Sequence, residues 1–233
     1  MLLDGLLLLF VWRQRLARRA ALSLLAAIAF GTRVSFDNVE LEGIGNVSID
    51  DIRMADDMGY HIKLLGVAQM TGRGLEQRMT PCLVPAESPL GQLQGGTNMV
   101  VLEGDSVGQI VLRGPGAGMG PTASAVMADV IDIARGTRLP TFGVPAHLLR
   151  DAVPALSATP APYYLRMTLL DKPGALAKVA TCIGEAGISI DQMRQINQPG
   201  DADDDAIVLF VTHKAAPADI AHALATFAAT GVV

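Results

Sequence analysis

Three glycines, Gly114, Gly116 and Gly118, stand at alternating positions just before a segment with the composition of a helix. Glycine lets a ligand approach the backbone closely, and a helix begins with unpaired N–H groups and a partial positive charge. The run is therefore a candidate site for an anion such as a phosphate. It is not the GxGxxG sequence of a dinucleotide-binding fold, because no βαβ unit with an acidic residue about 20 positions later surrounds it. The alternative is that the glycines only permit a tight turn from a strand into a helix.

A second candidate site is the loop Asp171-Lys-Pro-Gly174, which leads into another predicted helix. Backbone N–H groups at such a helix start can hold the carboxylate of an amino acid, and Asp171 can bind its ammonium group. Asp171 and Gly174 are the residues that this reasoning singles out. The alternative is that Pro173-Gly174 simply makes a turn in a domain that serves dimerisation.

Helices and strands must hold both loops in place. In the first part of the chain, the sequence pattern predicts the following helices and strands. A helix over 20–30 ends at Gly31, and Ser48 with Asp51 begins a short helix that runs to about Met58. Alternating apolar and polar residues predict strands at 33–41, 61–70, 77–84, 98–103 and 107–113, with a hairpin turn at Gly104-Asp105. A helix at 121–135 follows the glycine run, with Pro121 in its first turn.

The last part of the chain follows a proline-rich segment that we expect to be a linker. The predicted elements are strands at 163–170, 188–195 and 206–212, helices at 175–186 and 217–227, and a polar turn at 197–205. The order β-α-β-β-α is that of a ferredoxin-like unit without its last strand. We expect that this strand does not fully form before Val233, the last residue of the sequence. Strands and helices in this order predict an α+β protein.

Composition excludes several classes of function. The 233 residues are 50% hydrophobic, which argues against disorder, and the net charge of −5 with 4% aromatic residues argues against nucleic-acid binding. Cys82 and Cys182 form no CxxC pair, which indicates free thiols in a reducing cytoplasm rather than a disulfide framework. The four histidines lie at no metal-ligand spacing, so we expect no metal site.

The apolar stretches near the amino terminus do not predict a membrane protein. Residues 6–12 and 20–30 are each shorter than the roughly 18–20 residues that span a bilayer. The arginines follow the first stretch, whereas a signal peptide carries its positive charges before the apolar core. We therefore expect neither a membrane association nor export.

The middle of the chain resembles homoserine dehydrogenases. The matching blocks, in order from about Leu22 to Gly136, are Phe30-Gly-Thr-Arg-Val, Glu42-Gly-Ile, Ile62-Lys-Leu-Leu-Gly-Val-Ala, Pro81-Cys-Leu-Val-Pro and Gly114-Pro-Gly-Ala-Gly with Pro121-Thr-Ala-Ser-Ala-Val. The resemblance implies NAD(P)-dependent interconversion of homoserine and aspartate semialdehyde, on the route to threonine, methionine and isoleucine. It also implies that Gly116, with Gly114 and Gly118 beside it, contacts the nicotinamide cofactor.

The chain departs from this family at its amino-terminal end. The resemblance implies a Rossmann domain, with its dinucleotide fingerprint, before this point, and we expect this chain to lack it. Aligned back from Phe30-Gly31, the family's substrate-binding aspartate falls on Ala17 and its proton-donating lysine on Ala21. A methyl group cannot donate a proton, so we expect no catalytic residue in this chain. A shifted reading frame, a misplaced start or a genuine divergence would each explain the loss of similarity before Leu22.

The end of the chain resembles an ACT domain, through Leu169-Leu-Asp-Lys-Pro-Gly-Ala-Leu-Ala-Lys-Val and Gly187-Ile-Ser-Ile. The resemblance implies a paired domain that senses an end product, with threonine the first candidate.

Together these patterns predict four segments: an unrelated 1–21, the remainder of a mixed-sheet substrate and dimerisation domain at 22–137, a linker at 138–161 and an ACT domain at 162–233. We expect a cytoplasmic homo-oligomer, a dimer or a tetramer, that is inactive alone. The rival hypothesis is a non-catalytic protein that senses amino acids or dimerises through its ACT domain.

Overall fold

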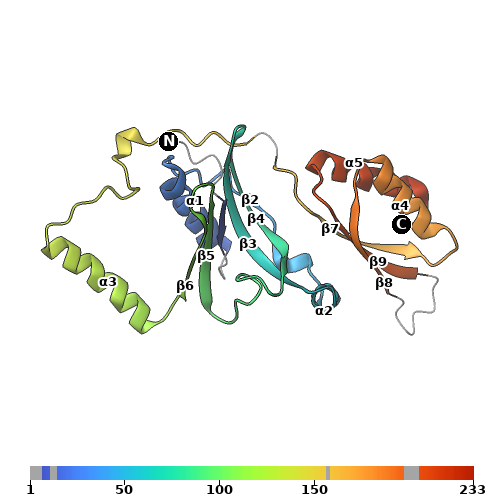
Figure 1. The fold of residues 1–233 in the computed structure, drawn as a ribbon, viewed down its shortest axis with the longest axis horizontal. Helices are drawn as coiled ribbons and strands as arrows, with labels where there is room; N and C mark the ends of the chain where they lie inside the picture. Colours follow the sequence, from blue (N-terminus) through green and yellow to red (C-terminus); the bar gives the residue numbers. More distant parts are fainter. Residues whose placement is uncertain (1–6, 11–14, 156–157, 197–204) are drawn as a thin grey trace. The chain divides into compact units, whose positions relative to one another are not determined.

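The computed structural model describes residues 7–10, 15–155, 158–196 and 205–233 (Figure 1). The chain folds as two compact units, residues 1–156 and residues 157–233, which are described separately below. In the described residues, no helix is both long enough and apolar enough to cross a membrane.

The first unit is built on a six-stranded sheet with the order β2-β4-β3-β1-β5-β6. Its strands are β1 (Leu7–Phe10), β2 (Glu40–Leu41), β3 (Tyr60–Thr71), β4 (Gly74–Pro85), β5 (Thr97–Gly104) and β6 (Gly108–Pro115). Its helices are α1 (Arg15–Phe30), α2 (Ile49–Asp57) and α3 (Met119–Ala134), with short 3-10 turns at Ile44–Asn46 and Ala146–Leu148. All neighbouring strands are antiparallel except β2 and β4, which are parallel.

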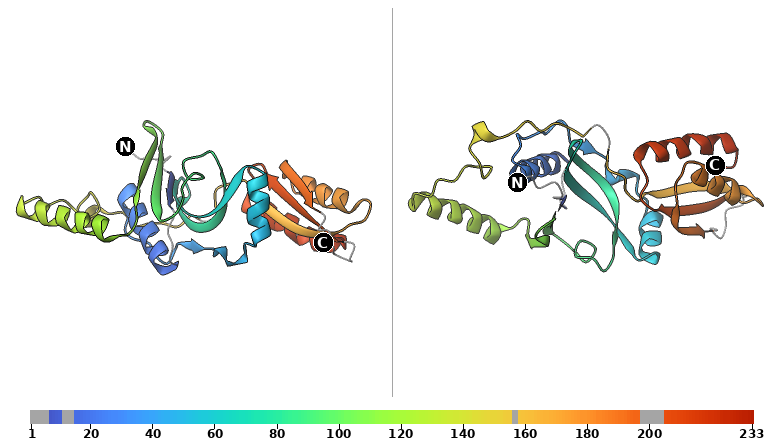
Figure 2. Two further views of the ribbon diagram at one scale, coloured as in Figure 1. Left: turned by 90° about the horizontal axis from the view of Figure 1, so that it is seen from below. Right: turned by 45° about the horizontal axis from the view of Figure 1, so that its top comes forward.

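Helix α1 covers one face of this sheet (Figure 2). Leu22, Ala26 and Phe30 recur at every fourth position, so they share one face of the helix and are buried against Ala68 and Met79. The close approach requires a glycine in β3, because a Cβ on Gly66 would lie 3.3 Å from both Leu22 Cδ1 and Met79 Cε. The predicted helix end at Gly31 is confirmed, since this residue has a φ of 62°.

The predicted strand at 33–41 is wrong except at its last two residues, which form β2. Residues Ser35-Phe-Asp-Asn38 form a turn instead of a strand. Asn38 Nδ2 donates to Ser35 Oγ at 2.7 Å, and the Val39 N–H donates to the Phe36 carbonyl. Polar side chains of this type bond their own backbone, and therefore compete with strand pairing. The Arg19 guanidinium fixes the turn from α1 by donating to the Val39 carbonyl at 2.8 Å.

The predicted short helix is confirmed as α2, and it begins with a capping box. Ser48 Oγ accepts from the Asp51 N–H at 3.1 Å, and Asp51 Oδ2 accepts from the Ser48 N–H at 2.8 Å. Two unpaired donors of the first helical turn are satisfied in this way. Gly59, with a φ of 81°, follows the helix as predicted.

We expect Ser48→Ala to lower the free energy of unfolding of the first unit by about 1 kcal/mol, because the Asp51 N–H loses its acceptor. Urea unfolding followed by circular dichroism measures this difference. Ser106→Ala, in the exposed turn between β5 and β6, is the control and should change the free energy by less than about 0.5 kcal/mol. Equal effects of the two substitutions would show that the cap contributes nothing.

The other predicted elements of the first unit are confirmed with small changes at their ends. Strands β3 and β4 form one long hairpin, and β5 and β6 form a second. Helix α3 begins two residues earlier than predicted and is followed by Gly136, with a φ of 73°. Every residue of α3 is exposed.

Part of the segment expected to be a linker is bonded to the first unit. The Arg33 N–H donates to the Arg150 carbonyl at 2.7 Å, and the Leu75 N–H donates to the Val153 carbonyl at 2.7 Å. The Arg150 guanidinium in turn donates to the Phe30 carbonyl. Residues 150–155 therefore follow the sheet edge rather than spanning a gap.

The second unit has the predicted β-α-β-β-α order. It comprises β7 (Tyr164–Leu170), α4 (Ala175–Glu185), β8 (Ile190–Ile196), β9 (Asp205–Thr212) and α5 (Pro217–Phe227), with a final 3-10 turn at Ala228–Thr230. The strand order is β7-β9-β8, and all pairs are antiparallel. Most of the turn predicted at 197–205 lies outside the described residues.

Both helices of the second unit pack on one face of its sheet, where Phe210, Val179 and Ile183 are fully buried. At the outer edge of β7, the Leu170 N–H donates a hydrogen bond to the carbonyl of Val232, near the end of the chain, at 2.9 Å. Val232 is buried in the same core. The fold is α+β throughout, as the sequence predicts.

Candidate functional site

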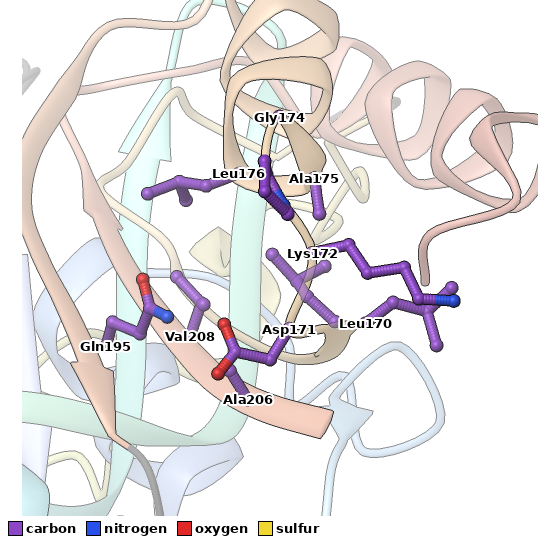
Figure 3. A pocket seen from close by; sticks show the side chains of 11 residues that line it. Leu170, Asp171, Lys172, Gly174, Ala175, Leu176, Gln195, Ala206 and Val208 are labelled. Carbon is purple, nitrogen blue, oxygen red and sulfur yellow. The ribbon is translucent and has the colours of Figure 1, made fainter. Parts of the chain in front are cut away.

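A cavity of about 330 Å³ opens at the amino-terminal end of α4 (Figure 3). The loop that the sequence singles out forms one wall, and β8 and β9 form the other. The lining residues are Leu169, Leu170, Asp171, Lys172, Pro173, Gly174, Ala175, Leu176, Gln195, Ala206 and Val208. Asp171 and Gly174, predicted as ligand contacts, therefore both lie at the cavity.

The loop conformation explains why the sequence needs glycine at its end. Gly174 has a φ of 89°, in the left-handed region that residues with a side chain rarely adopt, and it occupies the N-cap position of α4. The Ala175 N–H donates to the Lys172 carbonyl at 3.1 Å, which closes the turn. No side chain caps α4, so the helix start offers backbone N–H groups and its positive dipole end to the cavity.

The side chains around this helix start give the cavity a polar and an apolar side. Figure 3 shows the Asp171 carboxylate turned from the loop toward Gln195 of β8, whereas Lys172 points away from the cavity. Ala206 and Val208 of β9 form the apolar floor. The cavity can therefore bind a ligand that has a cationic group, an anionic group and a small side chain.

Sequence reasoning missed Gln195. The register shows why this residue reaches the cavity: Gln195 pairs with Val208, whose side chain is in the core beneath the helices, so both lie on the same face of the sheet. A polar residue on the helix-facing side of a strand is the signal that could have identified it. That signal is readable only once the pairing of β8 with β9 is known.

The glycine run lies in the first unit, between β6 and α3. Gly114 is in β6, and Gly118 is the N-cap of α3 with a φ of 132°. At Gly116 a Cβ would lie 1.9 Å from Nδ2 of Asn98, a residue of β5. Asn98 therefore supplies a structural reason for glycine at 116, independent of any cofactor, and the cofactor contacts of the three glycines stay a prediction.

A nicotinamide dinucleotide does not fit this unit as a whole. Its sheet has one parallel pair, and that pair joins the two-residue β2 to β4. In the part of the chain that the structure describes, no βαβ unit places a helix start between parallel strands, which is the arrangement that holds a pyrophosphate. The glycine run offers backbone contacts only, and no step of hydride transfer follows from these residues.

The aligned catalytic positions both fall in α1, where Ala21 is half-buried. The nearby cation, Arg19, is occupied by the turn described above and lies 5.1 Å over the Phe36 ring. Nothing at Ala21 can supply a proton. The Ala17 side chain lies outside the described residues.

Two other ionisable groups of the first unit have pKa values that burial shifts. Burial raises the pKa of the Cys82 thiol to about 11, so it is protonated and poorly nucleophilic at neutral pH. Desolvation lowers the pKa of Lys63, whose ammonium donates to the Leu93 carbonyl at 2.5 Å. Among the residues that the structure describes, no three His, Cys, Asp or Glu side chains gather in a way that could hold a metal ion.

Known proteins share both parts of the chain. Residues 17–131 match the family model of homoserine dehydrogenase, and residues 163–231 match that of the ACT domain. The chain carries the carboxy-terminal part of a homoserine dehydrogenase, followed by an ACT domain. Within the homoserine dehydrogenase segment, the match includes most of α1, the whole described sheet apart from β1, and most of α3.

Individual relatives extend across both units. Homoserine dehydrogenase of Pseudomonas aeruginosa is 38% identical over 89% of this chain and 49% of its own length, and that of Neisseria gonorrhoeae is 36% identical over 91% and 50%. The crystal structure of a homoserine dehydrogenase from Thiobacillus denitrificans superposes with a TM-score of 0.77 and 35% identity, over 89% of this chain and 48% of that one. The chain thus spans about half the length of the homoserine dehydrogenases that it matches.

Proposed function

We propose that this chain is the dimerising and amino-acid-sensing part of an NAD(P)-dependent homoserine dehydrogenase, and that its effector binds in the cavity at the start of α4. The cavity is the observation that carries the proposal. It joins the Asp171 carboxylate, the Gln195 amide and the free N–H groups of a helix start around one small volume. An α-amino acid carries the complementary charges on adjacent atoms.

Threonine is the first candidate among the amino acids. Its ammonium group can be held by Asp171 and its carboxylate by the first turn of α4, as at other helix starts that bind anions. Its methyl group suits the floor formed by Ala206 and Val208, and its hydroxyl can bond to the Gln195 amide. The proposal places such sensing in the cytoplasm, where homoserine and threonine are made.

We further propose that the chain forms a homo-oligomer through the edge of its first sheet. Strand β6 is the last strand of that sheet, and Ile110, Val111 and Leu112 are consecutive exposed residues in it. Because side chains of a strand alternate between faces, both faces of this edge are apolar. An eight-residue edge strand whose only charged residue is Arg113 would invite pairing with a second copy.

Calorimetric titration of the purified 233-residue chain with threonine should give a binding isotherm at millimolar concentration or below. Isoleucine, methionine and lysine are titrated in parallel to define the effector. Asp171→Ala should weaken the binding by at least tenfold, because the ammonium group loses its counter-charge.

Glu185→Ala is the matched control. It removes a carboxylate from the exposed carboxy-terminal end of the same helix and should leave the affinity unchanged within about twofold. If none of the four amino acids gives heat above dilution, the sensing proposal fails and dimerisation alone remains as the role of the second unit.

A further inference from the structure

Strand β1 joins the two hairpins of the first unit into one sheet, because β3 and β5 do not pair with each other directly. Residues Leu7–Phe10 pair with residues 66–69 of β3 on one side and with residues 100–103 of β5 on the other, antiparallel in both cases. The strand slot is the space between these two stretches of β3 and β5. In the described residues, the continuity of the sheet therefore depends on a strand of four residues.

The walls of the strand slot are held in place by contacts that do not involve β1. On one face of the sheet, Val67 of β3 and Val101 of β5 lie in one buried core with residues of the loop between the two hairpins. On the other face, Leu22 of α1 lies in a second core with Ala68 of β3, and Leu102 of β5 packs against that core. Both hairpins are thus linked above and below the slot, so we expect the slot to keep its width when β1 leaves it.

The slot requires an apolar extended strand rather than one particular sequence. The homoserine dehydrogenase match begins at residue 17, so both walls lie inside the match and β1 lies outside it. A strand inside a sheet is bound through its backbone, and apolar residues suit a position that is covered on both faces. The sequence Leu-Leu-Leu-Phe of β1 meets this requirement, and every other copy of the chain carries the same strand.

The pairing of β1 is limited, which favours its release from the sheet. It covers four residues of the twelve in β3 and four of the eight in β5. All other described elements of the first unit follow β1 in the chain, so the strand can leave while they stay folded. Short segments with few pairing partners open at a lower free-energy cost than the core of a domain.

A strand that moves to a second copy regains the contacts that it loses in its own. Because strand and slot are identical in every copy, the closed monomer and the exchanged dimer contain the same strand pairs. Their free-energy difference then depends on protein concentration and on the connection to α1, which residues 11–14 provide. Five residue steps span at most about 17 Å, and a connection this short favours exchange.

We propose that the strand slot is a strand-acceptor site and that two copies of the chain exchange β1 through it. Each copy places Leu7–Phe10 between β3 and β5 of the other. This association differs from pairing at the β6 edge, in which every slot stays filled by the strand of its own chain. It goes beyond the proposed function and depends neither on amino-acid sensing nor on the β6 edge.

Disulfide trapping between two variants of the 233-residue chain tests the exchange, with Cys82 and Cys182 replaced by alanine in both. One variant carries Leu9→Cys and a tag that increases its mass, and the other carries Val101→Cys, at the position that pairs with Leu9. Paired residues of antiparallel strands have Cα atoms about 4.5–5.5 Å apart, which a disulfide can bridge. The variants are unfolded in urea, refolded together and mildly oxidised. We expect a covalent dimer of mixed mass on a non-reducing gel.

Val111→Cys, in place of Val101→Cys, is the matched control. Val111 pairs with Val101 but lies one strand further from the slot, so its Cα is about 10 Å from that of Leu9, beyond the reach of a disulfide. We expect at least tenfold less mixed dimer with this control. Leu8→Cys with Leu102→Cys is a second pair across the slot, for which the same result as with the first pair is expected.

A single chain that carries both Leu9→Cys and Val101→Cys shows how much of β1 stays in its own slot. Its covalent dimer should increase with protein concentration at the expense of the disulfide within one chain. If this chain forms only the internal disulfide at every concentration, and neither mixture gives a mixed dimer, the proposal is wrong. Equal amounts of mixed dimer with Val101→Cys and with Val111→Cys would indicate random collision and would also overturn it. So would the absence of any disulfide, since β1 would then not lie beside β5.

Discussion

The purified 233-residue chain will oxidise homoserine at no measurable rate with either NAD or NADP. The position aligned with the family's proton-donating lysine is Ala21, and proton transfer by a positioned side chain contributes roughly 10²–10⁴-fold to such reactions. The larger loss comes from the cofactor, because the described residues of the first unit hold no parallel βαβ arrangement for a dinucleotide. Absorbance at 340 nm, followed with millimolar homoserine over hours, measures this rate.

The full-length Pseudomonas aeruginosa enzyme, assayed in parallel, shows that the conditions support turnover. Ala21→Lys is the informative variant: it restores the side chain but not the dinucleotide fold, so it should remain inactive. Turnover by the unmodified chain that scales with protein concentration and survives repurification would contradict two conclusions. These are the alignment of the family's lysine with Ala21 and the inference that the sheet of the first unit cannot hold a dinucleotide.

Phe210→Ala will lower the free energy of unfolding of the second unit by about 3–5 kcal/mol, which is the usual cost of removing a fully buried aromatic ring. Phe210 lies in β9, the central strand of the sheet, has no exposed surface, and is part of the core beneath both helices. A small domain has only about 5–15 kcal/mol of net stability, so this unit would be close to unfolding. Hydrogen exchange of residues 164–227 in increasing urea measures the loss locally.

Leu224→Ala is the control, because that side chain of α5 is half-exposed and its truncation leaves no cavity. We expect it to cost less than about 1 kcal/mol. A Phe210→Ala variant whose second unit exchanges as slowly as the unmodified chain would show that the assigned core is wrong. In the expected case, binding of threonine would be lost together with the fold.

Local signals in the sequence account for much of the fold. Ser48 and Asp51 make a capping box because both partners are within three residues of each other, so tertiary contacts are not needed to specify it. Gly31, Gly59 and Gly136 end helices with positive φ for the same reason. The strand predicted at 33–41 failed because an alternating pattern also contained turn residues, and Arg19, far away in sequence, stabilises the turn.

The residues of the candidate site also fall into two groups, those that local sequence predicts and those that only strand pairing brings to the site. Asp171 and Gly174 could be predicted because a helix start and its loop are contiguous in sequence, and the conformation of Gly174 depends on its own backbone. Gln195 could not, since it reaches the cavity only through the pairing of β8 with β9. Likewise, no sequence pattern indicates that Asn98 occupies the space beside Gly116, because that contact depends on the register of β5 against β6.

The α+β class, the order of nearly all elements, the family resemblance and the loop from Asp171 to Gly174 could be predicted from the sequence, since each depends on periodicity or on residues a few positions apart. Which of two apolar helices is buried could not be predicted in this way, because it depends on the tertiary structure. Helix α1 is rich in Ala and Leu, and α3 is rich in Ala, Val, Ile and Met, yet α1 packs on the sheet and every residue of α3 is exposed. Burial depends on whether a complementary surface is within reach, and Gly66 opens the sheet to Leu22, whereas the described part of the first unit provides no such surface for Val130.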